Sequence, residues 1–310
     1  MHHIVLWSVI PVIFTFLFST RINSRNIAAA LTILALMSSI AGVYRHFAGA
    51  ERTYGFTGGY FTLAALVVFT LPVTIGWASN QSRGKFALAL LSSILQIAVL
   101  WWTYTRSAFL AVIVGFSLAA IILMIRFRKK WTKGIALRIC AHLLPIIVLI
   151  TLILVSSDSR INPLSQTTNT TAESIDLSSG RNEIIRDATI ILSRSVKENE
   201  WGRVIFGYGL ASRKILVNSI FRSWESDYLE ALMNQGIIGL LILLTIYWKF
   251  LLLVKRYFFR PEHPVAFGYA VSGLGFWLMS FLTVQLLGIY NPAFFAILYG
   301  ALSEKTPELA

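Results

Sequence analysis

Long apolar runs alternate with short polar connections along this chain of 310 residues. A helix that crosses the hydrocarbon core of a bilayer needs about 20 predominantly apolar residues. The candidate segments are Ile4–Thr20, Ile27–Tyr44, Tyr60–Ala78, Phe86–Thr103, Ser107–Ile125, Ile135–Val155, Gly236–Val254, Ala266–Leu286 and a shorter, tilted or re-entrant one, Asn291–Ser303. The sequence therefore predicts an all-α, polytopic membrane protein of about eight to nine transmembrane helices.

The composition agrees with this class. Hydrophobic residues make up 56% of the chain and charged residues 13%, against about 25% charged residues in ordinary soluble domains. Ile4–Thr20 follows no basic residue and precedes no small-residue cleavage site, so we interpret it as a retained span rather than a signal peptide. The single cysteine, Cys140, excludes a disulfide within the chain.

The net charge of +13 does not indicate nucleic-acid binding, because the basic residues lie in short loops between spans. Every second loop is basic, with Arg21 and Arg25, then Arg83 and Lys85, then Arg126, Arg128, Lys129, Lys130, Lys133 and Arg138, then Lys255, Arg256 and Arg260. The positive-inside rule places these loops in the cytoplasm. The chain then divides into a bundle of six spans (1–155), a large extracytoplasmic loop (156–235) and C-terminal spans (236–310).

The large loop holds most of the acidic residues of the chain. It also holds seven arginines, Arg160, Arg181, Arg186, Arg194, Arg203, Arg213 and Arg222. Helical spacing places Ile184, Ile185, Ala188, Ile191 and Leu192 on one face of a helix over Asn182–Val196. This amphipathic helix is predicted to lie on the membrane surface or to pack on the spans. Phe206–Gly209 is predicted to form a turn.

Five charged residues are candidates for chemistry. Arg106 lies at the edge of a span, where an arginine has a function or snorkels to the interface. Arg52 lies in the outer loop that precedes Tyr60–Ala78, where it could instead form a surface salt bridge with Glu51. Arg181 stands at the start of the amphipathic helix, where the backbone N–H groups and the helix dipole favour a bound anion. The alternative is an arginine that is simply solvated in the loop. Glu225 and Asp227 are helix caps or general bases.

The sequence contains no histidine or cysteine pair with metal-ligand spacing and no glycine-rich phosphate loop. We therefore expect no metal and no other cofactor, and no ATP-driven mechanism. The energy of any transfer would come from the substrate itself.

Several of these residues, taken in order, resemble the motifs of the O-antigen ligase and O-antigen polymerase superfamily. The resemblance rests on Arg52–Phe56, Thr105–Ser107, Ser178–Arg181, Phe206–Gly209 and the closing signature Ser226–Gly239. It covers essentially the whole chain, which resembles a polymerase-like member that is short at its N-terminus. A further alternative is that the chain is a non-catalytic remnant, because it has fewer spans before the large loop than members of the family usually have.

The resemblance implies a metal-independent membrane glycosyltransferase of the bacterial cytoplasmic membrane. Its donor would be an oligosaccharide on undecaprenyl pyrophosphate, and its product an O-antigen, capsule or exopolysaccharide. Carried over to this sequence, Arg52, Arg106 and Arg181 would bind the pyrophosphate, and Arg106 would also assist catalysis. A chain-length regulator or a flippase would be a further partner, besides the bilayer.

One position departs from the family pattern. Ligases typically carry a histidine at the head of the closing signature, where this chain has Ser226 and Asp227, preceded by Glu225. We therefore expect Glu225 or Asp227 to act as the base, and a polymerase rather than a ligase that transfers glycan to lipid A–core. A non-enzymatic transporter of lipid-linked sugars is the alternative from another class, although no internal repeat supports it.

Overall fold

The chain is described by a computed structural model that covers residues 23–56, 59–79, 81–128, 132–156, 181–217, 223–287 and 291–303. Every regular element among these residues is a helix, which confirms the all-α class. The predicted first span, Ile4–Thr20, lies outside the described residues, as do Arg160, Arg222, Lys129 and Lys130.

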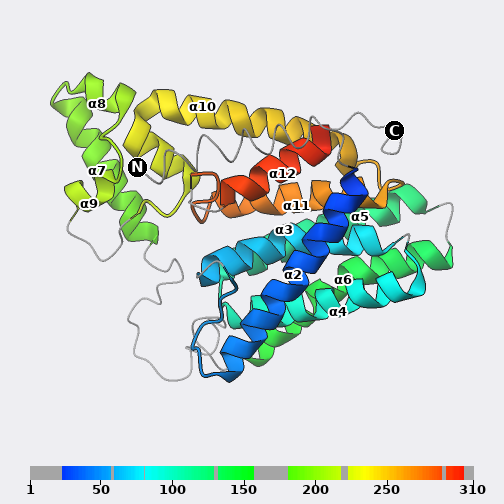
Figure 1. Cartoon of the computed structure of the whole chain (residues 1–310). Helices are drawn as coiled ribbons and strands as arrows, with labels where there is room; N and C mark the ends of the chain where they lie inside the picture. Colours follow the sequence, from blue (N-terminus) through cyan, green and yellow to red (C-terminus); the bar gives the residue numbers. More distant parts are fainter. Residues whose placement is uncertain are drawn as a thin grey trace.

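Six of the described helices are long and apolar enough to cross a membrane. They are α2 (Ser24–Phe47), α3 (Tyr60–Ala78), α4 (Arg83–Trp102), α5 (Arg106–Phe127), α6 (Lys133–Val155) and α10 (Asp227–Phe258). Two shorter apolar helices, α11 (Pro264–Ser280) and α12 (Asn291–Ser303), complete the bundle. The chain is therefore a multi-pass membrane protein, and Figure 1 shows its bundle beside a separate group of small helices.

The central helix of the bundle is α3, which is buried along most of its length. Its closest neighbour is α11, and glycines allow the two backbones to meet. A Cβ at Gly76 would lie 2.3 Å from the carbonyl oxygen of Pro264, and one at Gly268 would lie 2.6 Å from that of Pro72. Small residues commonly provide such close packing between membrane helices, where burial from water supplies no driving force.

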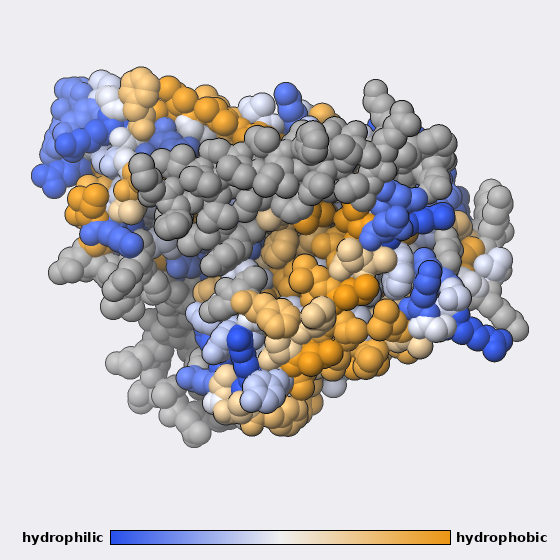
Figure 2. Space-filling model, in the orientation of Figure 1, coloured by the Kyte–Doolittle hydropathy of each residue, from blue (hydrophilic) through white to orange (hydrophobic). Residues whose placement is uncertain are grey.

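Described parts of three of the loops that the sequence predicts on one side lie at one end of the bundle. Arg126, at the end of α5, donates from Nε to Oε1 of Glu262 at 2.7 Å, just before α11 begins. The contact between Gly76 and Pro264 joins the end of α3 to the same place. We call this the basic end. On the face drawn in Figure 2, polar surface at both ends flanks an apolar middle, as a membrane-spanning body requires.

The other end carries the loop helices, defined here as α7 (Arg181–Lys197), α8 (Trp201–Phe206) and α9 (Ser212–Leu216). The predicted amphipathic helix is present as α7. Ile184 and Ala188 are buried in a small cluster that includes Trp224 and Met233, whereas Ile185 is 52% exposed. The position of this helix on the membrane surface stays a prediction.

The helix α10 is broken near its start. Gly236 has φ 70° and ψ −164°, and the first turns stand at an angle to the rest (Figure 1). This region of backbone conformation is essentially accessible only to glycine. The segment Asp227–Gln235 thus points towards the loop helices, while the remainder of α10 runs along the bundle.

The prediction for Ala266–Leu286 is wrong at its C-terminal end. The helix stops at Ser280, and the backbone N–H groups of Gln285, Leu286 and Leu287 donate to the carboxylate of Asp227 instead of continuing a helix. The apolar run 281–287 therefore forms a turn against the start of α10.

Candidate active site

The connection between α2 and α3 is fixed by Thr53, which is fully buried. Its N–H donates to the Trp102 carbonyl at 3.1 Å, and its hydroxyl donates to the Gly42 carbonyl at 2.7 Å. The loop that carries Arg52 is thereby joined to the end of α4, four residues before Arg106. Arg52 itself lies over the ring of Tyr60 at 4.5 Å, at the start of α3.

A residue that the sequence analysis missed shapes this loop. The Arg45 guanidinium lies over the Tyr54 ring at 4.0 Å and donates to the carbonyl oxygens of Tyr54 and Gly55. No motif marks Arg45, because its two acceptors are backbone groups whose position depends on the fold.

Arg106 begins α5 after a very short connection from α4. Tyr104 has φ 53°, a left-handed conformation that is uncommon outside glycine, and Thr103, Thr105 and Ser107 around it are buried. The turn therefore holds Arg106 at the first position of α5, half-buried at the edge of the bundle.

Arg181 begins α7 and reaches the bundle, where its Nε donates to the Leu282 carbonyl at 3.1 Å. Leu282 follows the end of α11, so its carbonyl has no place in a continued helix. Burial lowers the pKa of Arg181, Glu225 raises it and Arg106 lowers it further. A charge shifts the pKa of another group only when the two lie close together. Arg106, Arg181 and Glu225 therefore lie near one another, although more than a hundred residues separate Arg106 from Glu225 along the chain.

Glu225 is held in an unusual position. Its φ is 57°, and it stands between two buried anchors, Trp224 and Ser226, while remaining half-exposed itself. The Ser223 hydroxyl donates to its Oε1 at 3.2 Å. Left-handed conformations of residues other than glycine cost on the order of 1–3 kcal/mol and cluster at functional sites. Tyr104, two residues before Arg106, and Glu225 both show this feature, as do Asn199 and Ala211 in the loop helices.

Asp227 occupies a different environment, since its side chain is fully buried. The Tyr247 hydroxyl donates to its Oδ2 at 2.6 Å, and three backbone N–H groups of the 285–287 turn donate at 2.8–3.0 Å. Both carboxylate oxygens are thus occupied by the protein. This geometry is that of a residue that positions the 281–287 turn, and with it the Leu282 carbonyl that Arg181 contacts.

The Phe206–Gly209 turn and the closing signature contact each other directly. Tyr208 N–H donates to the Met233 carbonyl at 2.8 Å, and Gly209 N–H donates to that of Asn234 at 3.1 Å. These carbonyls are available because α10 breaks at Gly236. A Cβ at Gly207 would lie 2.4 Å from the Asn234 carbonyl carbon, so glycine is required on this side as well.

A buried polar network supports the site from behind. Arg213 is fully buried, donates to Oδ2 of Asp187 at 2.9 Å and lies over the Trp224 ring at 4.9 Å. The Trp224 indole N–H donates to the Ser212 hydroxyl at 2.9 Å, and that hydroxyl donates to Oδ1 of Asn234 at 2.7 Å. The network ties α7 and α9 to the segment that presents Glu225.

The structure thus brings Arg106, Arg181 and Glu225 together, places Arg52 on the adjoining loop, and buries Asp227 behind them. Among the described residues, no group of three or more histidine, cysteine, aspartate or glutamate side chains is arranged to hold a metal ion. The arrangement offers two cations and one carboxylate that are only half-buried, which suits an anionic substrate with a transferable proton.

Residues 91–244, about half of the chain, match the family described as O-Antigen ligase. The chain carries a domain of the O-antigen ligase and polymerase superfamily. The matched segment contains Arg106, Arg181, Glu225 and Asp227, whereas Arg52 precedes it. No curated protein matches the chain. Members of this superfamily are glycosyltransferase-like membrane enzymes, ligases or polymerases, which fits a site of half-buried arginines at one end of a membrane bundle.

Proposed function

We propose that this O-antigen ligase superfamily member is a membrane glycosyltransferase that polymerises glycan repeat units linked to undecaprenyl pyrophosphate. The product would be a bacterial surface polysaccharide, such as an O-antigen, a capsule or an exopolysaccharide. The observation that carries the proposal is the convergence of Arg106, Arg181 and Glu225 from three separate segments. The positive-inside pattern favours an extracytoplasmic site on the cytoplasmic membrane.

The arginines would bind the pyrophosphate of the donor. A guanidinium presents several N–H donors in a fork that matches phosphate oxygens and keeps its charge at any physiological pH. Arg106 and Arg181 face one neighbourhood, and Arg52 lies on the loop joined to it through Thr53 and Trp102. Their positive charge would stabilise the negative charge that develops on the leaving pyrophosphate.

In the reaction, the Glu225 carboxylate accepts the proton of a sugar hydroxyl on the acceptor. The hydroxyl oxygen attacks the anomeric carbon of the donor glycan, and the bond from this carbon to the pyrophosphate oxygen breaks. Undecaprenyl pyrophosphate leaves with the bonding electron pair. No nucleotide and no oxidant is consumed, because the energy of the glycosyl–pyrophosphate bond drives the transfer.

Ligation to lipid A–core is the second candidate, since the matching family is described as O-Antigen ligase. The chemistry at the donor would be the same, and only the acceptor would differ. Ser226 and Asp227 stand where ligases typically carry a histidine, which favours polymerisation. Supplying lipid A–core together with the donor distinguishes the two, because a ligase would produce modified lipid A–core and no ladder.

The test is polymer formation by the purified full chain in lipid nanodiscs, supplied with undecaprenyl-pyrophosphate glycan and no nucleotide. Arg106→Ala and Arg181→Ala are each expected to slow ladder formation by about 10²–10³-fold, the effect of removing a donor that stabilises developing negative charge. Arg194→Ala is the matched control, because Arg194 lies on the same helix as Arg181 but is exposed and paired with Glu198 at 2.8 Å. Wild-type rates of ladder formation in both Arg106→Ala and Arg181→Ala, or a requirement for nucleotide, would contradict the proposal.

The base is tested by comparing Glu225→Gln with Asp227→Asn. Glu225→Gln is expected to slow turnover by about 10²–10⁴-fold at unchanged thermal stability, because only proton transfer is lost. Asp227→Asn is expected to lower stability by about 1–3 kcal/mol, since an amide NH₂ would face a backbone N–H. Normal turnover by Glu225→Gln would assign the base to another group.

A further inference from the structure

The end of α11 carries an exposed aromatic ring. Phe281, which follows the last turn of α11, is 46% exposed. Its ring stacks on that of Tyr228, with centroids 4.5 Å apart and planes inclined by 21°, and it meets the Trp277 ring edge to face at 5.0 Å. Two neighbours therefore fix the orientation of this ring while nearly half of its side chain stays open. A ring held in this way is preorganised for a flat, partly apolar ligand.

The stack is fixed from its buried side by Asp227. Tyr228 also stacks on Tyr247, at 5.7 Å and 29°, and the Tyr247 hydroxyl donates to Oδ2 of Asp227 at 2.6 Å. The Ser280 hydroxyl lies 3.4 Å from that of Tyr228. Exposure rises along the stack, from the buried Tyr247 through the half-buried Tyr228 to Phe281. Phe281 is thus the outermost ring of a series that the Asp227 carboxylate anchors.

Phe281 also lies beside the charged groups of the candidate active site. The residue after it, Leu282, accepts a hydrogen bond through its carbonyl oxygen from Nε of Arg181 at 3.1 Å. The carbonyl oxygen of the residue before it, Ser280, lies 3.5 Å from the hydroxyl of Ser226, which follows the candidate base in the chain. Both chain neighbours of Phe281 therefore contact segments that carry the site, one with a half-buried cation and one with a half-exposed carboxylate.

This combination fits a sugar better than a hydrocarbon chain. A pyranose carries hydroxyl groups at its rim and C–H bonds on its faces, so one face can stack on an aromatic ring while the hydroxyls meet polar groups. Ligand sites of this kind combine apolar and aromatic walls with a few polar groups that fix orientation. A prenyl chain could cover the same ring, but it would gain nothing from the charged groups beside it.

We propose that Phe281 is the platform on which the first sugar of the donor stacks, the sugar that is joined to the pyrophosphate. This proposal rests on the proposed function, since the pyrophosphate bound by Arg181 would bring that sugar to the ring. It also gives the buried Asp227 a further role, because the stack that Asp227 anchors through Tyr247 and Tyr228 holds the Phe281 ring in place.

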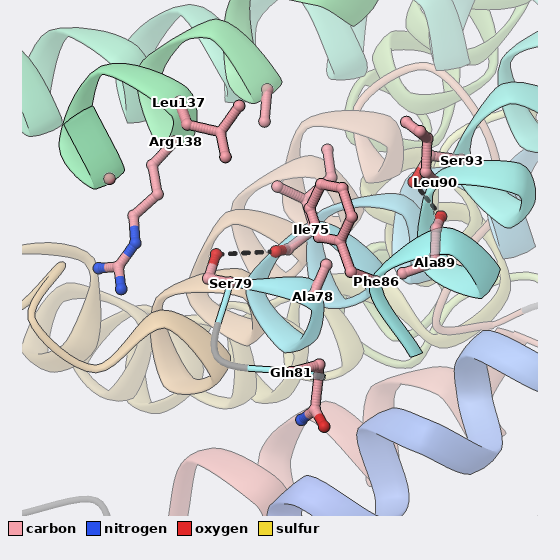
Figure 3. A pocket seen from close by; sticks show the side chains of 12 residues that line it. Ile75, Ala78, Ser79, Gln81, Phe86, Ala89, Leu90, Ser93, Leu137 and Arg138 are labelled. Atoms are coloured by element: carbon pink, nitrogen blue, oxygen red, sulfur yellow. Dashed lines mark hydrogen bonds between the residues drawn. The ribbon is translucent and has the colours of Figure 1, made fainter. Parts of the chain in front are cut away.

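A second partly exposed phenylalanine offers a matched control. Phe86, near the start of α4, is 37% exposed and lines a cavity of about 230 Å³ at the basic end of the bundle (Figure 3). The same cavity is lined by apolar residues such as Ile75, Leu90 and Leu137. Phe86→Leu therefore removes a ring of similar exposure at the end of the bundle that is remote from the candidate active site.

Native mass spectrometry of the full chain in detergent tests the proposal with two lipids. One is undecaprenyl pyrophosphate, and the other is undecaprenyl pyrophosphate carrying one glucose, whose equatorial ring hydroxyls leave C–H bonds on its faces. Phe281→Leu is expected to weaken binding of the glucosylated lipid by about threefold to tenfold, the contribution of one aromatic contact. Binding of the bare lipid should change by less than about twofold, and Phe86→Leu should change neither lipid by more than about twofold.

A variant that keeps a ring separates stacking from packing. Phe281→Trp is expected to bind the glucosylated lipid within about twofold of the wild-type chain. Thermal unfolding of each variant in detergent checks that the bundle is intact. Equal weakening of both lipids by Phe281→Leu, unchanged binding of the glucosylated lipid, or an equal loss in Phe281→Trp or Phe86→Leu would each overturn the platform.

Arg181→Ala distinguishes a failure of this proposal from a failure of the proposed function. It is expected to weaken both lipids, because both carry the pyrophosphate. If it weakens neither, Arg181 does not bind the pyrophosphate and the proposed function loses that role. A loss confined to the glucosylated lipid in Phe281→Leu would still support the platform in that case.

Discussion

The bundle and the loop helices are held together by different means. In the bundle, α3 and α11 meet through glycines, and a large continuous apolar core surrounds them. In the loop helices, the apolar cluster is small, with Ile184, Ala188, Trp224 and Met233 at its centre. Buried polar contacts, above all Arg213 with Asp187, complete the packing there.

The difference shows where specific side chains matter. A span is held in the membrane by its hydropathy, and many apolar residues fulfil that requirement equally well. The loop helices have too little apolar surface to rely on, so each depends on a particular donor and acceptor. Glu225 and Arg181 are attached to this second kind of structure, and their positions should therefore be sensitive to single substitutions that the bundle would tolerate.

The largest effect is expected from breaking the buried ion pair. Arg213→Met leaves the Asp187 carboxylate without its partner and should lower the free energy of unfolding by about 3–5 kcal/mol. Chemical unfolding in mixed micelles, followed by the fluorescence of Trp224 and its neighbours, measures the change. The double variant Arg213→Met with Asp187→Leu should recover part of this loss; a double variant no more stable than the single one would contradict the ion-pair account.

A graded effect is expected from three glycines of the same region. Gly207→Ala should cost about 2–5 kcal/mol, because φ is 84° and the new Cβ would overlap the backbone at Asn234. Gly209→Ala, with φ 90° but open space around it, should cost about 1–2 kcal/mol. Gly202→Ala, inside α8 with open space, should be neutral or slightly stabilising. Thermal unfolding of the three purified variants gives the order, and equal losses would show that the contact with α10 is unimportant.

The smallest effect is expected at the basic end. Arg126 and Glu262 form an ion pair of similar length to the buried one, but their side chains are 60% and 39% exposed. Arg126→Gln should therefore cost less than about 1 kcal/mol. Chemical unfolding in mixed micelles measures the change. A loss of unfolding free energy as large as that of Arg213→Met would contradict the proposed distinction between the two regions.

The same contrast explains how far the sequence could predict the structure. Hydropathy located Tyr60–Ala78 and Asn291–Ser303 with the bounds that the structure has. It failed for 281–287, which is apolar but bonded to Asp227 more than fifty residues away. A carboxylate that terminates a distant helix leaves no periodic signal in the sequence.

The roles of the candidate site residues stay predictions, but their positions can be compared. Motif resemblance pointed to Arg52, Arg106 and Arg181, and the departure from the motif pointed to Glu225 and Asp227; the structure places all five at one end of the bundle. The sequence could not separate the half-exposed Glu225 from the fully buried Asp227, since they stand two residues apart and only burial distinguishes them. Arg45 and Arg213 act through contacts that exist only in the folded chain.

The break at Gly236 also determines how much of α10 can span the membrane. As a continuous helix, the 32 residues of α10 would measure about 48 Å, well beyond a hydrocarbon core of about 30 Å. The part that follows Gly236, from Ile237 to Phe258, measures about 33 Å, which matches that thickness. The helix length therefore places Gly236 at the edge of the hydrocarbon, and it places the segment just before Gly236, which includes Glu225, at the water boundary.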